Sequence, residues 1–218
     1  FGIVSLLMNG HALKRLTMPD SQVSIENEIA CLARLSSSPT HIAPRLYSAW
    51  ICPKKTERVS GSQFVDLSLV FKAMTDYDCY IEMEYLDAKE LRYIPERELT
   101  ARVVKTLIYK TLVLHYDYGI YHNDLHMGNV LYQTHPNGTV SDVFIVDYGF
   151  AAEKEDAGWP DLVSIRADLM TLRKSILDNP FLMEEWRDAL TDIEDEIQGW
   201  FDKDLPRRDL LLLAYCNK

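Results

Sequence analysis

YHNDLHMGN, the run at residues 121–129, holds an aspartate, Asp124, and an asparagine, Asn129, five positions later. An apolar helical pattern precedes this run, and a short apolar strand pattern follows it at residues 130–132. A carboxylate can accept a proton from a hydroxyl group, and an amide oxygen is a ligand that Mg²⁺ accepts. We therefore interpret the run as a loop that carries chemistry, set between a helix and a strand.

A second apolar strand pattern, at residues 144–146, ends in another acidic residue, Asp147. An Asn-Gly pair at residues 137–138 lies between the two strand patterns and is typical of a hairpin turn. Pairing of the strands would bring Asp147 beside the loop that bears Asn129. Phosphoryl transfer needs a proton acceptor for the attacking hydroxyl and oxygen ligands for Mg²⁺, and these residues supply both. The alternative is that Asp124 and Asn129 cap turns and that Asp147 only closes a strand.

Together these residues resemble the catalytic loop and the metal-binding D-F-G motif of protein kinases. The form H-x-D-L-H-x-G-N at residues 122–129 is most similar to haspin-type atypical kinases, and it also resembles aminoglycoside and choline phosphotransferases. The resemblance implies an enzyme that uses ATP and Mg²⁺, with Asp124 as the base and with Asn129 and Asp147 holding the metal. It also implies an α+β fold with a small β-rich lobe and a mainly helical lobe.

The first residues predict a β-hairpin, because an Asn-Gly pair at residues 9–10 separates two β-prone runs. The second run contains Lys14 in Ala-Leu-Lys, which resembles the V-A-I-K strand of kinases, whose lysine holds the α- and β-phosphates. Taken alone, Lys14 is more simply interpreted as an edge-strand lysine that points into water. Lys72, which follows a later apolar run, is a weaker alternative for the same role.

An amphipathic helix follows, since apolar residues recur at three- and four-residue steps between residues 25 and 35. Helix-start residues precede it at residues 19–21. The segment resembles the αC helix of kinases, and the resemblance makes Glu28 the ion-pair partner of Lys14. Glu26 is the rival candidate, but the leucine spacing after Glu28 fits that pattern better.

The run DCYIEMEYLD, at residues 78–87, is β-prone at first and then resembles the fifth strand and the hinge of kinases. By that resemblance Met83 is the gatekeeper, and the backbones of Glu84 and Leu86 bond the adenine edge. Glu90 would reach the ribose. The alternative for Met83 is ordinary packing in the core, where methionine is a common gap-filler.

A longer helix is predicted to open at residues 95–98 and to end at Gly119, a residue typical of helix C-caps. It resembles the helix that carries the catalytic loop in kinases. Arg102, Lys105 and Lys110 are expected off its apolar face. That face is expected to contain Val104, Leu107, Ile108, Thr111, Leu112 and His115, the last as a core or rim histidine.

Two residues of the loop depart from the usual kinase pattern. Asn123 replaces the arginine that normally pairs with a phosphorylated activation loop, so we predict that the enzyme does not need this phosphorylation. His126 stands where Ser/Thr kinases carry a lysine that steadies the γ-phosphate. A ring N–H of histidine could do the same, and better when the ring is protonated. The alternative is that His126 makes a structural hydrogen bond within the loop.

The stretch after Asp147 is short. Asp168 resembles the aspartate that braces the kinase catalytic loop from a following helix, and it comes only 21 positions later, without an A-P-E motif between. The peptide-docking platform is thus abbreviated, as in haspin-like and small-molecule phosphotransferases. Beyond Pro180, a further helical pattern has an apolar stripe from Leu182 to Trp200. Its acidic opposite face is interpreted mainly as solvated surface.

The 218 residues are 47% hydrophobic and carry a net charge of −10. This excess of acid argues against a general nucleic-acid binder and fits a basic protein substrate or no charged partner. The four cysteines form no C-x-x-C pair, so we interpret them as reduced thiols of an intracellular protein, cytoplasmic or nuclear. No apolar run is long enough to span a membrane.

We expect a small lobe at residues 1–86 and a large lobe at residues 87–218. The sequence begins at Phe1 without a Gly-rich phosphate loop, so we expect this loop and the first strand to lie upstream. The prediction is an atypical Ser/Thr protein kinase. A small-molecule phosphotransferase is the alternative, and a non-catalytic scaffold that keeps the fold is the third hypothesis.

Overall fold

The computed structural model describes residues 3–17, 22–53, 77–95, 98–153 and 162–178, together with Gly199. This part of the chain combines strands and helices, so the α+β fold expected from the sequence is confirmed. The division into two lobes at residue 86 stays a prediction.

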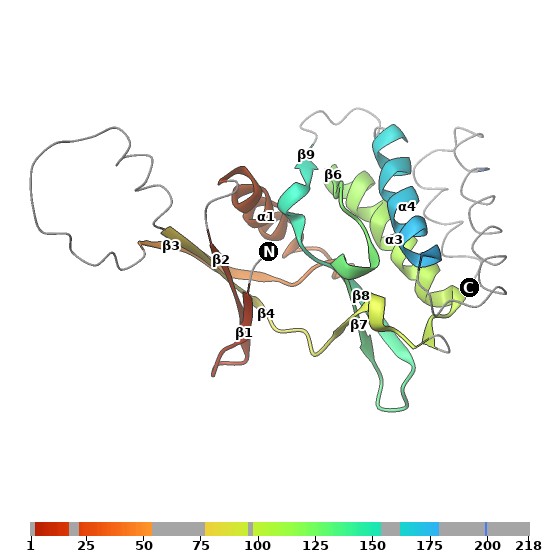
Figure 1. Cartoon of the computed structure of the whole chain (residues 1–218), viewed down its shortest axis with the longest axis horizontal. Coiled ribbons are helices and arrows are strands. Elements are labelled where there is room, and N and C mark those ends of the chain that lie inside the picture. The colour runs from red at the N-terminus through yellow and green to blue at the C-terminus, as the bar shows by residue number, and fades with distance from the viewer. Residues whose placement is uncertain are drawn as a thin grey trace, which may run out of the picture.

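Figure 1 shows a sheet that carries helix α1 (Gln22–Leu35) on one side of the molecule. Helices α3 (Ala101–Tyr118) and α4 (Leu162–Leu177) lie on the other side. The short strands and turns that contain residues 120–153 run between the sheet and these two helices.

The sheet consists of four antiparallel strands in the order β1-β2-β4-β3. Its strands are β1 (Ile3–Leu6), β2 (His11–Thr17), β3 (Leu46–Pro53) and β4 (Tyr77–Glu84). Ala12, Lys14 and Leu16 of β2 are buried, whereas Arg15 is exposed. Because neighbouring side chains of a strand point to opposite faces, this alternation places Lys14 on the inner face of the sheet.

The hairpin between β1 and β2 is confirmed, but its turn is not the two-residue type I′ turn that the Asn-Gly pair suggests. Leu7 N–H donates to His11 O at 2.8 Å, and Gly10 N–H donates to Leu7 O at 3.0 Å, so the loop is longer. Gly10 has a φ of 81°, whereas Asn9 keeps a negative φ. A type I′ turn needs positive φ at both central residues. Asn9 instead uses its side-chain Oδ1, which accepts from His11 N–H at 3.0 Å.

Shorter elements complete the described fold. A three-stranded antiparallel sheet has the order β5-β7-β8, with β5 (Lys89–Glu90), β7 (Val130–Thr134) and β8 (Val140–Ile145). Strand β6 (Ile120–Tyr121) pairs with β9 (Ala152–Glu153). Three 3₁₀ turns are η1 (Leu91–Tyr93), η3 (Met127–Asn129) and η4 (Tyr148–Phe150). Val130 opposes Ile145 in the β7–β8 pair, so the residues before β7 and after β8 lie at the same end of this sheet.

Helix α3 begins later than predicted. It starts at Ala101 rather than at residues 95–98, because the backbone of Thr100 is extended, with a φ of −97° and a ψ of 160°, and this interrupts any helix that begins at Pro95. Its end is as predicted: Gly119 has a φ of 63°, in the left-handed region that glycine tolerates best. The predicted apolar face is buried at every position, namely Val104, Leu107, Ile108, Thr111, Leu112 and His115.

Lys110 was expected off this buried face, and that expectation is wrong. Its side chain is buried, and its Nζ atom donates to His41 O at 2.9 Å and to Val143 O at 2.7 Å. The same atom lies 2.7 Å from Asp142 Oδ1. Burial lowers the pKa of Lys110, and the Asp142 carboxylate raises it again in part. The lysine therefore connects α3 to β8 and to the loop before β3.

Some predictions lie outside the described residues. They concern the helix-start residues 19–21, the alternative lysine Lys72, and the apolar stripe from Leu182 to Trp200 apart from its Gly199. Within the ranges given above, no helix combines the length and the apolarity needed to cross a lipid bilayer.

Candidate active site

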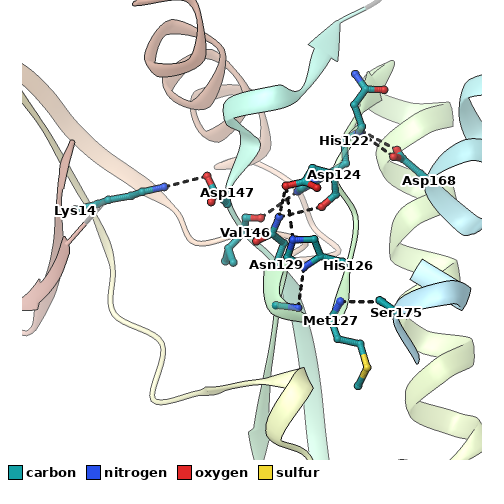
Figure 2. A network of polar contacts seen from close by, with 12 residues as sticks. Lys14, His122, Asp124, His126, Met127, Asn129, Val146, Asp147, Asp168 and Ser175 are labelled. Carbon is teal, nitrogen blue, oxygen red and sulfur yellow. Dashed lines mark hydrogen bonds and ion pairs between the residues drawn. The ribbon is translucent and has the colours of Figure 1, made fainter. Parts of the chain in front are cut away.

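A buried lysine joins three elements that are far apart in the sequence. Lys14, on the inner face of β2, is 7% exposed. Its Nζ atom donates to Glu28 Oε1 of α1 at 2.5 Å and to Asp147 Oδ1, just after β8, at 3.3 Å. Glu28 is buried whereas the rival Glu26 is exposed, so Glu28 is the partner of Lys14. Figure 2 shows Lys14 extending toward Asp147.

Burial is the main influence on the Glu28 carboxylate. It raises the pKa of Glu28, and the charge and hydrogen bond of Lys14 lower that pKa again in part. A carboxylate buried without a cation is costly, so Lys14 and Glu28 depend on each other. Asp147 differs from Glu28 because its side chain is 42% exposed. The ammonium is thus fixed from one side by Glu28 and borders an accessible carboxylate on the other.

The Asp124 loop, residues 121–129, is held from helix α4 by Asp168, which is 1% exposed. Asp168 Oδ2 accepts from His122 N–H at 2.8 Å, and Oδ1 accepts from Asn123 N–H at 2.8 Å. His115 of α3 adds a third contact, with its Nε2 atom 2.9 Å from Asp168 Oδ2. The bracing role that the sequence resemblance suggested for Asp168 matches these bonds, which Figure 2 shows in part.

Two residues of the site have a backbone conformation that is rare for side chains other than glycine. Asn123 has a φ of 60°, and Asp147 has a φ of 67°. Such conformations persist where the surrounding structure fixes them, and they occur often at functional sites. Asn123 also bridges to the segment after Asp147, since its Nδ2 atom donates to Phe150 O at 3.1 Å. The residue that replaces the usual arginine therefore joins the two segments without a charged pair.

Asp124 and Asn129 are in direct contact. Asn129 Nδ2 donates to Asp124 O at 2.9 Å and to Asp124 Oδ2 at 3.1 Å. Since the amide nitrogen is used in this way, Oδ1 is the side-chain atom of Asn129 that is suited to a cation. Val146 N–H donates to Asn129 O at 2.9 Å, so Asp147 is one residue away from this pair. Figure 2 shows the three side chains close together.

His126 makes a hydrogen bond within the loop, as the structural alternative required. Its Nδ1 atom accepts from Gly128 N–H at 3.0 Å and caps η3. In the neutral ring the proton is then on Nε2, and this atom lies 3.7 Å from Asp124 Oδ2. Nε2 is the ring nitrogen that remains for a ligand.

The predicted hinge follows β4. Met83 is 9% exposed and belongs to the hydrophobic core cluster, so it packs in the core as the alternative interpretation proposed. This packing does not conflict with a gatekeeper role. Glu84 N–H donates to Arg45 O at 2.8 Å, and Leu86 O accepts from Ala88 N–H at 2.8 Å. Leu86 N–H has no acceptor among the described residues, so it is suited to a ligand acceptor.

Glu90, expected to reach a ribose, is already in an ion pair. Arg92 Nε lies 2.5 Å from Glu90 Oε2, a contact that no sequence motif predicts. The site supplies only some of the ligands that a divalent cation needs. No group of three or more His, Cys, Asp or Glu side chains in the described ranges could hold a metal ion. Asn129 and Asp147 suit a cation such as Mg²⁺, which completes its shell with water and phosphate oxygens.

Sequence reasoning missed several supports of the site. His115 was expected only as a core or rim residue, and its position on the buried face of α3 was the one signal of its contact with Asp168. Ser175 of α4 is a second support, because its Oγ atom accepts from Met127 N–H at 3.1 Å. Arg92, which contacts Glu90, is a third. No spacing in the sequence indicates which loop backbone a distant side chain will contact.

Comparison with known proteins agrees with the geometry. Residues 54–174, more than half of the chain, match the family model described as the ABC1 atypical kinase-like domain. The matched residues include the hinge and the Asp124 loop, whereas Lys14 and Glu28 precede them. No curated protein gives a significant match. The finer likeness to haspin-type kinases stays a prediction. With kinase-like motifs, an α+β fold and this match in agreement, the chain belongs to the family of ABC1 atypical kinase-like domains.

Proposed function

We propose that the chain is a phosphotransferase that uses ATP and Mg²⁺ to phosphorylate a Ser or Thr hydroxyl of a protein. The observation that supports this most is the convergence of one buried ammonium and two accessible carboxylates. Lys14 Nζ contacts Asp147. The residue before Asp147 donates its backbone N–H to Asn129 O, and the Asn129 side chain donates to Asp124. Phosphoryl transfer depends on positioning and on charge stabilisation, and these side chains provide both.

The nucleotide would be bound from two sides. When bound, Mg²⁺–ATP supplies the phosphoryl group and a cation that offsets its negative charge. Lys14, fixed by Glu28, would bind phosphate oxygens. Asn129 Oδ1 and the Asp147 carboxylate would hold the metal. Both are oxygen donors, which is the ligand type that Mg²⁺ prefers.

Recognition of the adenine would fall to the hinge. Leu86 N–H is suited to donate to the ring edge, and the backbone of Glu84 is its neighbour there. Met83, the buried second-to-last residue of β4, would limit the depth of the adenine site. Glu90 would reach the ribose, and its contact with Arg92 would fix the position of its carboxylate.

Asp124 would orient the acceptor hydroxyl and accept its proton. Its Oδ2 atom is held by Asn129 Nδ2 at 3.1 Å, which points the carboxylate in one direction. His126 Nε2, 3.7 Å from the same oxygen, would steady the transferred group through its N–H. Both Asp124 and His126 are partly exposed, at 40% and 38% of their side chains, so an acceptor can approach them.

Substitution of the two aspartates separates their roles. Asp124→Ala and Asp147→Ala should each reduce phosphate transfer by at least about 10³-fold. Titration with a fluorescent ATP analogue in the presence of Mg²⁺ should show weakened binding for Asp147→Ala and nearly unchanged binding for Asp124→Ala. Activity that survives either change would contradict the roles assigned here. A chain without any transfer activity that still binds a protein partner would support the scaffold hypothesis instead.

A small-molecule acceptor is the second candidate. It is favoured by the short stretch between Asp147 and Asp168, because a long activation segment normally provides the platform on which a peptide lies. Radiolabelled ATP would decide between the two. Label should enter Ser- or Thr-containing proteins under the first proposal, and choline or an aminoglycoside under the second.

We also propose an intracellular site of action, cytoplasmic or nuclear. Cys31 and Cys79 are buried and, with Cys52, are free thiols in the described structure. Burial raises the pKa of Cys31 to about 12, which keeps this thiol protonated and unreactive. Microscopy of the tagged full-length protein would test this proposal.

A further inference from the structure

A guanidinium group lies directly over the backbone of the Asp124 loop. A Cβ atom added to Gly128 would be 2.8 Å from Arg92 Cζ and closer still to Arg92 Nη2. The same Cβ atom would be 2.9 Å from His126 Cε1. Arg92 and His126 therefore share the space that a side chain at position 128 would fill. The absence of a side chain at Gly128 is what allows the guanidinium to approach the loop so closely.

Arg92 contacts two residues close to it in the sequence. Its Nε atom lies 2.5 Å from Glu90 Oε2, and its Cζ atom is 5.7 Å from the centre of the Tyr93 ring. Half of the Arg92 side chain remains exposed. The ion pair with Glu90 is made by Nε, which is not one of the terminal nitrogens Nη1 and Nη2. These terminal nitrogens are therefore suited to bind a ligand from solution.

This group is close to the site of proton transfer. Gly128 lies between His126 and Asn129, and both of these residues face the Asp124 carboxylate. Arg92 borders the His126 ring at position 128, and His126 Nε2 lies 3.7 Å from Asp124 Oδ2, so an acceptor bound at Asp124 can extend along the ring toward Arg92. A guanidinium binds carboxylate and phosphate groups through two parallel hydrogen bonds, which gives it selectivity as well as affinity.

We propose that Arg92, with His126, recognises an anionic group, a carboxylate or a phosphate, that the acceptor carries next to its hydroxyl. This inference rests on the proposed phosphotransferase function. It also reverses an expectation drawn from composition. The net charge of −10 favours basic partners for the surface as a whole. At the Asp124 loop, however, the Arg92 guanidinium is half exposed and the His126 side chain is 38% exposed, so two hydrogen-bond donors lie beside the Asp124 carboxylate.

Peptide kinetics test this inference. The full chain would be assayed with three peptides that share one Ser and differ only in flanking residues, which are Glu, Lys or Gln. The glutamate peptide should have a kcat/KM at least about tenfold above that of the glutamine peptide. In Arg92→Gln this ratio should fall to within about twofold of one. Arg102→Gln removes an exposed guanidinium from α3 and serves as the control, so it should keep the wild-type ratio.

The source of the anionic group is resolved by a second pair of acceptors. Glycerol 3-phosphate and glycerol carry the same hydroxyl chemistry with and without a phosphate. Preferential labelling of glycerol 3-phosphate, lost in Arg92→Gln, would assign the site to a small phosphorylated acceptor. Labelling restricted to the glutamate peptide would assign it to an acidic protein segment. Both results support the inference.

A binding measurement separates this inference from the proposed function. Fluorescent forms of the three peptides with Ala in place of Ser cannot be phosphorylated, and their affinities can be measured without turnover. Tighter binding of the glutamate peptide, reduced at least about fivefold in Arg92→Gln, would support the inference even if transfer were slow. Efficient phosphorylation with equal or better use of the lysine peptide would overturn the inference and leave the phosphotransferase standing. Absence of transfer to every acceptor would overturn the proposed function.

Discussion

Lys14 Nζ and Asp147 Oδ1 lie 3.3 Å apart although 133 positions separate them in the sequence. The contact connects the four-stranded sheet to the end of β8. Because the same ammonium also binds Glu28, three segments of the chain meet at one charge. Substitution of Lys14, Glu28 or Asp147 should therefore alter the environment of the other two side chains.

Glu28→Ala should lower the free energy of unfolding by about 3 kcal/mol, because it leaves the Lys14 ammonium buried with only the longer contact to Asp147. Chemical denaturation would measure the effect. Glu26→Ala is the matched control, since it removes a carboxylate from the exposed side of the same helix. It should change the free energy by no more than about 0.5 kcal/mol. Equal effects of the two substitutions would contradict the assignment of the pair.

Phosphatase treatment should leave the activity unchanged. Asn123 joins the Asp124 loop to the segment after Asp147 through a neutral hydrogen bond to Phe150 O at 3.1 Å. A phosphate group has no arginine at position 123 to bind. Transfer rates before and after treatment, with mass spectrometry to verify dephosphorylation, would check this expectation. A large drop in rate would show that another positively charged side chain binds a phosphorylated residue.

Acidification below about pH 6.5 should destabilise the protein through His122. Burial lowers the pKa of His122, although the Val146 carbonyl and nearby carboxylates raise it in part. Above an unfolded pKa of 6.5, the ring is neutral in both states and contributes no pH dependence. Below it, the unfolded chain takes up a proton that the folded chain resists, so stability falls toward the lower folded pKa.

The unfolding free energy measured between pH 5 and pH 8 would show this slope. His122→Gln keeps a donor that can reach the carbonyl oxygen of Val146 but does not titrate, so its slope should be smaller. His135 is exposed in the β7–β8 hairpin, and His135→Gln should leave the slope unchanged. Identical slopes in all three proteins would remove His122 as the cause.

Gly149→Ala should interfere with helix α1. A Cβ atom at this position would collide with Ser24 Oγ, while Ser24 Cβ is 3.7 Å away, an ordinary contact distance. The hydroxyl can rotate away at a cost of about 1 kcal/mol, and the unfolding free energy should fall by that amount. In a Ser24→Ala background the collision is gone, so the same substitution should cost much less. A double-mutant cycle would measure the coupling, and additive effects would contradict it.

Much of the site could be predicted from the sequence because its parts are encoded locally. Asp124 and Asn129 are only five positions apart, so a single loop brings them together. The alternation of β2 places Lys14 on the inner face, and the periodicity of α1 turns Glu28 inward rather than Glu26. Each of these patterns extends over only a few residues, which is the range over which sequence reasoning works well.

Other features could not be predicted because they depend on contacts between distant segments. Lys110 resembles a surface lysine, and it is buried only because two carbonyl oxygens and Asp142 meet its ammonium. Arg92 likewise reaches Gly128 through the packing of η1 on η3. The later start of α3 has a local cause, since the extended backbone of Thr100 separates the turn at Pro95 from the helix.

Asp168 has a consequence for attempts to transplant this chemistry. Its carboxylate accepts both backbone donors at residues 122 and 123, and yet it belongs to a helix more than forty positions downstream. Grafting the nine residues 121–129 onto another scaffold would carry the side chains without the anchor that shapes them. A designer would need to transfer helix α4 together with the loop, because the hydrogen bonds that hold the loop backbone come from a residue of that helix.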